Sequence, residues 1–481
     1  MKDLVLIGGG HSHAIVLKMF GIKPLPSVRL TLISDVLYAP YSGMLPGHVA
    51  GFYDYDECHI DLRSLAEFAG CQILVDRAIA IDFNKNLVIC QTSPPINFDV
   101  LSVDIGSTPA TISVPGAAEY AIPAKPVPEF LASWNQLISA TQNYPKKPVR
   151  IAIVGGGAGG VELALNMQSR LAKEEERRKK EEGRGKSEEG RRKREVGRGK
   201  KEEGRGKREE ERRKKEEGRG KKEEGRGKFG SGFCNGWILK ERGKFKQEEE
   251  LEINLFHSGA ELMPAHNKRV RRRLKEILIS RGIQLHLMEK VSAIQKQEMM
   301  EIASDSQCPM PNAQCPMPNA QCPMPIYQIY CESGLKIECD RIFWVTQASA
   351  AHWIGESGLA TDSNGFMQVN DCLQSVSHPN VFGAGDIAAM VNYPRPKAGV
   401  FAVRQGKPLF ENLQQFLLAK PLKPFAPQEK YLGLIGTGNK RAIASRGSWM
   451  WESALLWYWK DWIDRQFMQK FSNLQSTQKQ Q

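Results

Sequence analysis

The sequence predicts an α/β fold built from two βαβ units, and three glycine clusters carry that prediction. The first cluster, at residues 8–10, follows the apolar run at 4–7. The second, at 155–160, follows the apolar run at 151–154, and the third is Gly383-Ala384-Gly385-Asp386. A short apolar run before a glycine turn is typical of a buried strand that leads into a helix.

The segments around these clusters complete both units. After the first cluster we expect a helix near residues 13–20, strands at 28–33, 72–75 and 87–90, and a strand at 99–104 that ends in a tight glycine turn. After the second cluster we expect a helix at 159–171, a strand at 251–257, a helix at 267–281, strands at 283–287 and 340–345, and a return to the first unit at 381–386.

The glycine turns have the chemistry of dinucleotide cradles. A diphosphate is anionic and binds where backbone N–H groups converge at a helix N-terminus and no Cβ blocks its approach. Gly155, Gly157 and Gly160 complete the G-x-G-x-x-G spacing between a strand and a helix, which predicts NAD(P) binding. The first cluster begins the same pattern, but His13 stands where the third glycine belongs.

Two cradles and a late Gly-Asp pair fit a flavin and a nicotinamide held by one chain. We therefore expect two Rossmann-like dinucleotide-binding domains, with an FAD domain split around an inserted NAD(P) domain, and a C-terminal α+β or helical segment. The expected boundaries are 1–120 and 346–415 for the FAD domain, 121–345 for the NAD(P) domain and 416–481 for the C-terminal segment.

The acids that would hold the ribose hydroxyls are less regular. Asp35 follows the second strand of the first domain, where an acid normally binds the 2′-hydroxyl. The matching strand of the second domain ends at residues 257–259, with no acid before Glu261. The choice between NADH and NADPH therefore stays open, although Lys268 and Arg269 weakly indicate a 2′-phosphate site.

The basic charge is concentrated in one segment. The chain of 481 residues has a formal net charge of +13, but residues 173–228 contain 26 Lys and Arg against 17 Glu. The remaining 41 basic and 37 acidic residues nearly balance, which argues against nucleic-acid binding. Because this low-complexity sequence has few apolar residues to bury, we expect a disordered charged insert at 173–250. It is either a solvated expansion or a tether for an acidic partner or a nucleic acid.

The ten cysteines contain no CxxC and no CxxxxC pair, which predicts free thiols in a reducing cytoplasm and no metal site. Three of them lie in Cys-Pro-Met-Pro repeats, which we expect to form a surface hairpin at 305–326. No secretory signal follows Met1, and no run of 18 apolar residues is present, so we expect a cytoplasmic protein.

The C-terminal segment is rich in aromatic residues. Trp451, Leu455, Trp459, Trp462 and Ile463 share one stripe of an expected helix. Such a stripe packs against the flavin domain or a partner in a homodimer, or it lies in the headgroup layer of a membrane. Both interpretations of residues 449–471 stay open, the second as a peripheral contact with the cytoplasmic membrane face.

Five motifs carry a family resemblance: residues 8–13 (GGGHSH), 41–47 (YSGMLPG), 104–109 (DIGSTP), 396–406 (PKAGVFAVRQG) and 442–447 (AIASRG). In them the chain resembles flavoproteins of the pyridine nucleotide-disulfide oxidoreductase superfamily, and within it type II NADH dehydrogenases. It also resembles the flavoprotein module fused ahead of selenide, water dikinase in some bacteria. The resemblance covers most of the chain outside the two repeats.

The resemblance implies roles for individual residues. It places Asp386 beside the ribityl chain and diphosphate of FAD, the alternative being an Asp that only caps a turn, and Gly106 and Gly385 are further FAD-binding candidates. A helix that begins near Lys397 would point its N-terminus at the flavin pyrimidine edge, where the N–H groups of Gly399 and Val400 stabilise the reduced, anionic ring.

Two other candidates have open interpretations. His11 and His13 face the flavin or a phosphate, or they are local packing and hydrogen-bonding residues. Glu162 matches an acid that the family keeps at the flavin–nicotinamide junction, where it would contact His48 or Lys125, or it is simply an acid favoured in a first helical turn.

The missing CxxxxC pair decides the expected reaction. A disulfide reductase relays electrons through an adjacent thiol pair, and residues 41–49 contain no cysteine. We therefore expect an FAD-dependent NAD(P)H dehydrogenase that hands electrons directly to a quinone-like acceptor. The open alternatives are a flavoenzyme of selenium or sulfur metabolism and a non-catalytic, flavin-binding redox sensor.

Overall fold

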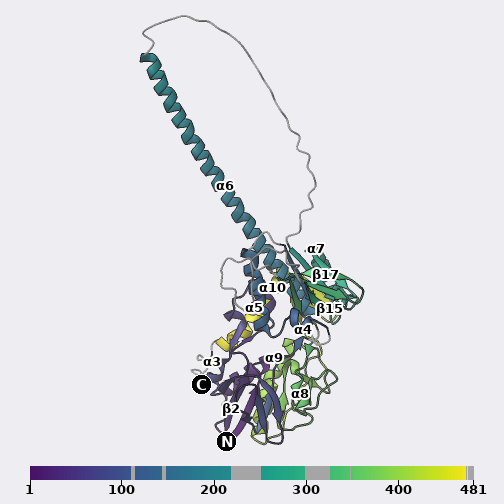
Figure 1. Ribbon diagram of the computed structural model, residues 1–481. Coiled ribbons are helices and arrows are strands. Elements are labelled where there is room, and N and C mark those ends of the chain that lie inside the picture. The colour runs from purple at the N-terminus through teal and green to yellow at the C-terminus, as the bar shows by residue number, and fades with distance from the viewer. Residues whose placement is uncertain are drawn as a thin grey trace, which may run out of the picture. The chain divides into compact units, whose positions relative to one another are not determined.

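The computed structural model (Figure 1) describes residues 1–109, 114–143, 148–217, 251–297, 325–346, 348–472 and 474. Its contacts divide the chain into two compact units. One unit is formed by Met1–Leu171 with Glu250–Gln481, and the other by Ala172–Glu249. Both glycine turns belong to the first unit.

A five-stranded parallel sheet forms the first domain, as the sequence predicts. Residues 381–383 return from far along the chain to pair with residues 101–103 at its edge. On the sheet, α1 (His11–Ile22) packs so closely against α9 (Gly399–Leu417) that the side chain of Ile15 leaves no room for a Cβ at Gly406. In order of pairing the strands are β21 (Val381–Gly383), β9 (Val100–Val103), β1 (Lys2–Ile7), β2 (Val28–Ser34) and β5 (Gln72–Val75).

A second parallel sheet of five strands forms the other domain, and it confirms the split of the first domain around it. Ile151 pairs with Ile253 even though the charged insert separates their strands in sequence. The helices of this domain are α5 (Val127–Asn143), α6 (Ala158–Glu217) and α7 (Lys268–Ser280). In order of pairing the strands are β11 (Ile122–Pro123), β18 (Arg341–Trp344), β12 (Val149–Val154), β13 (Leu251–His257) and β14 (Ile283–Leu287).

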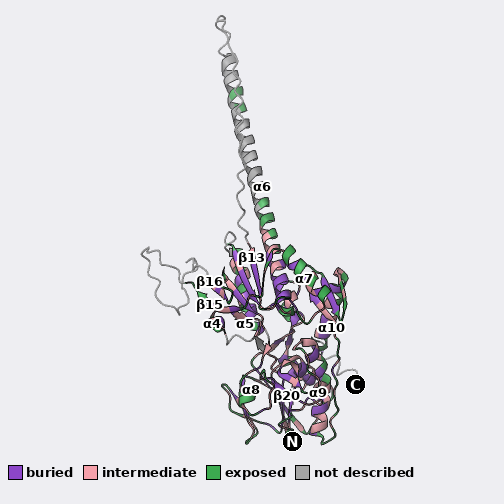
Figure 2. Cartoon of the chain, turned by 90° about the vertical axis from the view of Figure 1, so that its right-hand side faces the viewer, coloured by how far each residue is buried: buried purple, intermediate pink, exposed green. Residues whose placement is uncertain are grey.

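Both sheets are buried on their faces, which is why their strands read as continuous apolar runs. Figure 2 colours β13 as buried along most of its length. Smaller sheets complete the unit: β6 (Ala78–Asp82) with β7 (Leu87–Cys90) and β8 (Ile96–Asn97); β15 (Val291–Lys296) with β16 (Tyr327–Cys331) and β17 (Lys336–Cys339); β23 (Gly433–Gly436) with β24 (Ala442–Arg446) and β25 (Trp449–Ser453); β3 (Tyr38–Pro40) with β4 (His59–Asp61); β10 (Thr108–Pro109) with β19 (Ala348–Ser349); and β20 (Met367–Val369) with β22 (Ala388–Met390).

The remaining helices are short, except for the C-terminal one. They are α2 (Leu45–Val49), α3 (Leu62–Phe68), α4 (Ala117–Tyr120), α8 (Trp353–Glu356), α10 (Ala454–Ser472) and the 3-10 turns η1 (Asp56–Cys58) and η2 (Gly385–Ile387).

The expectation of a disordered insert that begins at residue 173 is wrong for its first part. α6 continues without interruption to Glu217. Lys, Arg and Glu are good helix formers, and their spacing allows i,i+4 ion pairs such as Glu175–Lys179 and Glu176–Lys180. These local terms favour a helix without a hydrophobic core, against a cost of about 1 kcal/mol for each glycine relative to alanine. Residues 218–250 lie outside the described residues.

The C-terminal aromatic stripe is a strand followed by a helix, which corrects the expectation of a single helix. Trp451 lies in β25, and α10 begins only at Ala454. Trp451 precedes Leu455 by four residues, so it fits a helical stripe even though it belongs to a strand. None of the described helices combines the length and the apolar character needed to cross a bilayer.

The cysteines that the structure describes are all free thiols: Cys58, Cys71, Cys90, Cys331, Cys339 and Cys372. The Cys-Pro-Met-Pro repeats lie outside the described residues. The strands on either side of them, β15 and β16, pair in antiparallel fashion.

Candidate functional site

The first glycine turn lies between β1 and α1 and has no room for side chains. Gly8 has φ +92°, and a Cβ added there would overlap the main-chain carbonyl of Asp104. An added Cβ at Gly9 would overlap the side chain of Leu62. Gly10 caps α1, and its N–H donates to the Asp104 carbonyl at 3.1 Å. The turn is therefore fixed against the end of β9, with the N-terminus of α1 beside it.

His13 stands at the third glycine position of the pattern and connects the glycine turn to β9. Its buried ring has Nδ1 2.7 Å from the Gly8 carbonyl oxygen and Nε2 2.8 Å from the Ser102 hydroxyl. Because a carbonyl can only accept, Nδ1 carries the proton and Nε2 accepts from Ser102. Burial lowers the pKa of His13 to about 4, so the ring is neutral. This supports the packing interpretation for His13.

His11 lies on the other side of the turn. Its Nε2 is 3.2 Å from the Pro40 carbonyl oxygen, and its ring lies edge-on to Tyr41 at 5.3 Å between centroids. Burial lowers the pKa of His11 as well. The ring thus joins the start of α1 to the motif at residues 41–47.

The second glycine turn differs from the first in one informative position. Gly155 has φ +132° and faces the Val345 carbonyl, and a Cβ at Gly160 would overlap the Gly155 carbonyl. Neighbouring main-chain atoms therefore leave no room for a side chain at either position. At Gly157 no described atom lies within 4 Å of an added Cβ. The open space beside the start of α6 is what a close-approaching diphosphate needs.

Asp386 is held between the two domains. Its Oδ2 accepts from Lys125 Nζ at 2.9 Å and from Ser107 Oγ at 3.1 Å. Burial alone would raise the pKa of Asp386, but the ammonium and the hydrogen bonds lower it below its ordinary value. Beside it, Gly106 has φ +69°, and no described atom lies within 4 Å of an added Cβ. No sequence pattern indicates that Lys125, which precedes α5, pairs with Asp386.

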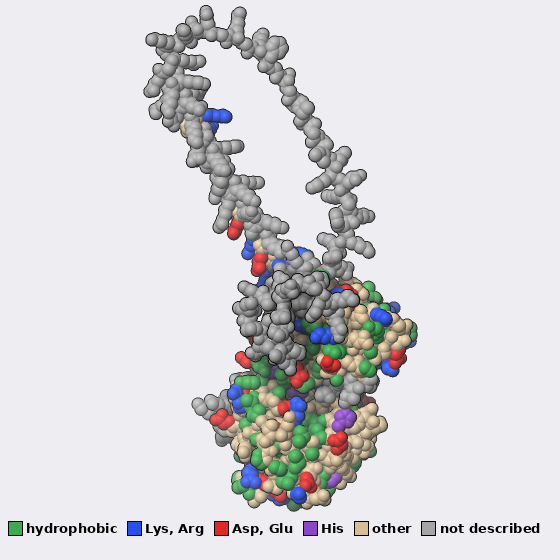
Figure 3. Space-filling view, in the orientation of Figure 1, with side chains coloured by type: hydrophobic (Ala, Val, Ile, Leu, Met, Phe, Trp, Pro, Cys, Tyr) green, Lys and Arg blue, Asp and Glu red, His purple; other side chains and the backbone are tan. Residues whose placement is uncertain are grey.

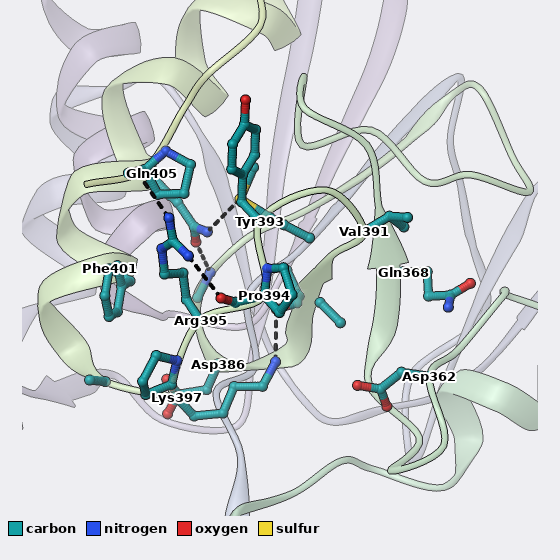
Figure 4. Close-up of a pocket in the computed structure, with 17 residues that line it drawn as sticks. Asp362, Gln368, Asp386, Val391, Tyr393, Pro394, Arg395, Lys397, Phe401 and Gln405 are labelled. Atoms are coloured by element: carbon teal, nitrogen blue, oxygen red, sulfur yellow. Dashed lines mark hydrogen bonds between the residues drawn. The ribbon is translucent and has the colours of Figure 1, made fainter. Parts of the chain in front are cut away.

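A cavity of about 260 Å³ opens beside Asp386 and the first turn of α9 (Figure 4). Gly399 and Val400 are the first two residues of α9, and no side chain caps this end. An added Cβ at Gly399 would contact Ser42 Oγ at 2.9 Å. The helix N-terminus therefore presents its amides beside the loop at residues 41–47, where they can stabilise negative charge.

Lys397 lines the same cavity (Figure 4). Its Nζ donates to the Ala388 carbonyl at 2.8 Å and lies 3.9 Å from the centre of the Phe366 ring. Burial lowers the pKa of Lys397 to about 8, while the carboxylates of Asp362 and Asp386 act in the opposite direction. The half-buried Lys397 side chain adds positive potential to this end of the cavity when it is protonated.

Glu162 does not contact His48 or Lys125, which corrects that expectation. Its Oε1 accepts from the Gly436 N–H at 2.7 Å, at the end of β23. Burial raises the pKa of Glu162 to about 7, against the opposing charge of Lys460. His48 Nδ1 instead lies 2.8 Å from the Tyr53 carbonyl oxygen. Glu162 can therefore take up and release a proton near neutral pH.

Sequence reasoning missed a buried ion pair near Glu162. Lys460 Nζ donates to Asp464 Oδ2 and to the Gly43 carbonyl, both at 2.6 Å. Asp464 is only 5% exposed. The i,i+4 spacing was visible, but only the docking of α10 on the loop at residues 41–47 shows that the pair is buried.

The ribose candidates remain accessible. Asp35, at the end of β2, is exposed and pairs with Arg77 at 3.0 Å. In the second domain Glu261 pairs with Arg271. The exposed Lys268 and Arg269 follow Asn267, whose side chain donates to the Gly447 carbonyl at 2.9 Å. These two cations therefore lie beside the C-terminal sheet.

Within the described ranges, no group of three or more His, Cys, Asp and Glu side chains is arranged to hold a metal ion. On the face drawn in Figure 3, acidic and basic side chains are interspersed among polar and hydrophobic ones.

Comparisons with known proteins identify relatives among NADH dehydrogenases. The chain is 28% identical over 173 residues to a NADH dehydrogenase-like protein of Bacillus subtilis, covering 35% of this chain and 45% of that one. It is 25% identical over 187 residues to an external alternative NADH-ubiquinone oxidoreductase of Yarrowia lipolytica, covering 35% and 32%. The chain thus spans less than half the length of these curated relatives.

The fold matches that of NDH2 from Plasmodium falciparum in complex with NADH, with a TM-score of 0.65, 13% identity, and coverage of 98% of this chain and 97% of that one. The family model for pyridine nucleotide-disulphide oxidoreductases matches residues 2–406. The chain therefore belongs to the pyridine nucleotide-disulphide oxidoreductase family, whose members bind FAD and use NAD(P)H.

Proposed function

We propose that this protein is an FAD-dependent NAD(P)H dehydrogenase that delivers electrons to a quinone-like acceptor without a redox-active disulfide. The observation that carries the proposal is the pair of glycine turns at the carboxyl ends of two parallel sheets in one compact unit. FAD, when bound, supplies the ring that accepts hydride and releases electrons. The chain supplies position and electrostatics.

The open space at Gly157 and Gly106 supports the fit of two dinucleotides. The N-termini of α1 and α6 would hold the two diphosphates, and the amides at the start of α9 would stabilise negative charge on the flavin. We assign the FAD contacts to Gly8, Gly9, Gly10, His11, Asp35, Gly106, Gly385, Asp386, Gly399 and Val400, and the NAD(P)H contacts to Gly155, Gly157 and Gly160.

Direct transfer follows from the cysteines. Residues 41–49, which include α2, contain none. Cys58 follows in η1, and burial raises its pKa to about 12, which keeps it a protonated thiol. An acceptor that diffuses to the flavin is therefore required. The ubiquinone in the name of the Yarrowia relative supports a quinone. A quinone also needs protons, and Glu162 is the candidate proton donor because its pKa lies near 7.

Anaerobic absorbance spectroscopy tests this function. NADH or NADPH should bleach the flavin band of the purified protein. A soluble quinone should restore the band directly, without a delay caused by electron transfer through a thiol pair. Selenium and sulfur compounds serve as competing acceptors. Protein that is colourless and cannot be reconstituted with FAD contradicts the whole proposal. Bleaching that only a selenium or sulfur compound reverses contradicts the quinone alone.

The C-terminal segment supports a peripheral contact with a membrane, where quinones reside. Five aromatic residues and Leu455, here called the aromatic surface, are 44% to 69% exposed. The exposed Lys268 and Arg269 at the start of α7 lie close to Trp449, since the neighbouring Asn267 donates to the Trp449 carbonyl at 3.2 Å. Aromatic rings beside cations suit an anionic headgroup layer. The aromatic surface consists of Trp449, Trp451, Leu455, Tyr458, Trp459 and Trp462.

Co-sedimentation with vesicles of anionic phospholipid tests this contact. The double variant W459S/W462S should lose vesicle binding, whereas I279S, which removes an exposed apolar side chain from α7, should keep it. If the double variant keeps vesicle binding but changes a dimer into a monomer in sedimentation velocity, the aromatic surface is a homodimer interface.

A further inference from the structure

The carboxylate of Asp104 lies at the junction of three segments that surround the proposed FAD diphosphate. It follows β9 and is 2% exposed. Its Oδ2 accepts from the N–H groups of Ser12 at 2.8 Å and His13 at 3.1 Å, in the first turn of α1. The α1 sequence has no acid of its own in that turn. Asp104 is therefore an internal anion at the N-terminus of α1.

This carboxylate also explains two glycines of the FAD motifs. A Cβ added at Gly10 would overlap the carboxylate, and a Cβ at Gly385 would overlap its Oδ1. Asp104 therefore touches the glycine turn on one side and the turn that carries Asp386 on the other. Its position fixes both turns relative to the helix end.

A diphosphate at the same helix end would face this carboxylate at close range. Repulsion between like charges is strong where water is excluded. The groups that face Asp104 offer little compensation. Asp386 is a second carboxylate, its partner Lys125 is already committed to it, and burial keeps the imidazoles of His11 and His13 neutral.

We propose that Asp104 is a positioning residue for the diphosphate of FAD and that its protonation state sets how tightly the cofactor is held. A protonated carboxyl still accepts hydrogen bonds from Ser12 and His13 through its carbonyl oxygen, but it no longer repels the diphosphate. This inference rests on the proposed function, because it presupposes that FAD binds at this turn.

The sign of the pH dependence follows from burial. Burial raises the pKa of Asp104 to about 7, and a bound diphosphate would raise it further. FAD binding then takes up a proton at pH values above about 7. The dissociation constant of FAD should therefore rise with pH, by at most about tenfold for each pH unit.

Fluorescence titration of the FAD-free full chain with FAD, from pH 6 to 9, tests the inference. The wild type should show the rise, and D104N should bind with a constant that changes less than about twofold over this range and equals the low-pH wild-type value. D104A should show the same flat profile as D104N but bind more weakly than D104N, because the Ser12 and His13 amides lose the acceptor that positions the helix end. D99N changes an exposed residue that directly precedes the same strand, and it should keep the wild-type profile.

Two results would overturn the inference. One is a wild-type constant that does not change with pH, which needs no variant. The other is a D104N protein that is folded by circular dichroism and keeps the wild-type profile. In both cases FAD still binds, so the proposed function survives. A wild-type protein that binds no FAD at any pH removes the proposed function and this inference together.

Discussion

Replacing Gly157 by valine should weaken the binding of NAD(P)H while the protein keeps its FAD. No described atom lies within 4 Å of a Cβ at this position, so the folded chain has room for the side chain. A bound diphosphate must approach the backbone of the turn, so the valine side chain would occupy the space that the diphosphate needs. Forcing atoms into filled space costs about 1–3 kcal/mol, which corresponds to roughly 5- to 150-fold in kcat/KM for NAD(P)H.

Two neighbouring glycines provide controls. At Gly159 an added Cβ meets only Val345 Cγ1 at 3.4 Å, so G159A should keep full activity and raise helix stability by about 0.5–1 kcal/mol. At Gly160 the Gly155 carbonyl lies in the way, so G160A should lower the unfolding temperature.

Stopped-flow absorbance at the flavin band measures the reduction rate of each variant, and the flavin-to-protein absorbance ratio measures retention of FAD. A G157V protein that loses FAD, or one that is reduced at the wild-type rate, would refute the assignment of the second turn to the nicotinamide.

Three further perturbations test other parts of the molecule. Burial raises the pKa of Glu162 from 4.5 to about 7, so between these pH values the native state keeps a proton that the unfolded chain has lost. The free energy of unfolding of the wild type should therefore fall relative to that of E162Q as pH rises from 4.5 to 7. A difference between the two proteins that does not change with pH would contradict this. Lys125→Gln leaves the Asp386 carboxylate without its cation and should lower the free energy of unfolding by about 1 kcal/mol, whereas K85Q, which breaks an exposed pair with Asp82, should cost less than about 0.5 kcal/mol in the same urea titration. Deleting residues 174–228 should leave the flavin reduction rate within about twofold and reduce the helical circular dichroism signal, because Leu171 is the last buried residue of α6 among those whose burial is described. A collapse of the rate would show that the insert acts on the site.

The sequence predicted most of the fold because the relevant signals are local. The apolar runs before the glycine clusters are buried parallel strands, and the return of residues 381–383 to β9 confirms the split domain. Local reasoning failed where two periodicities coincide. Trp451 fits a strand as well as the helical stripe, and the Lys–Glu spacing of the insert sustains a helix that its composition argued against.

The sequence by itself determined the two cradles, since a glycine turn after a strand is a property of contiguous residues. Only the tertiary structure decided which group faces each turn. The pairing of Lys125 with Asp386, the contact of Glu162 with Gly436 and the burial of Asp104 between Gly10 and Gly385 join residues that are far apart along the chain. Burial and charge at such junctions depend on how sheets and helices pack in space, and no spacing rule along the chain encodes that packing.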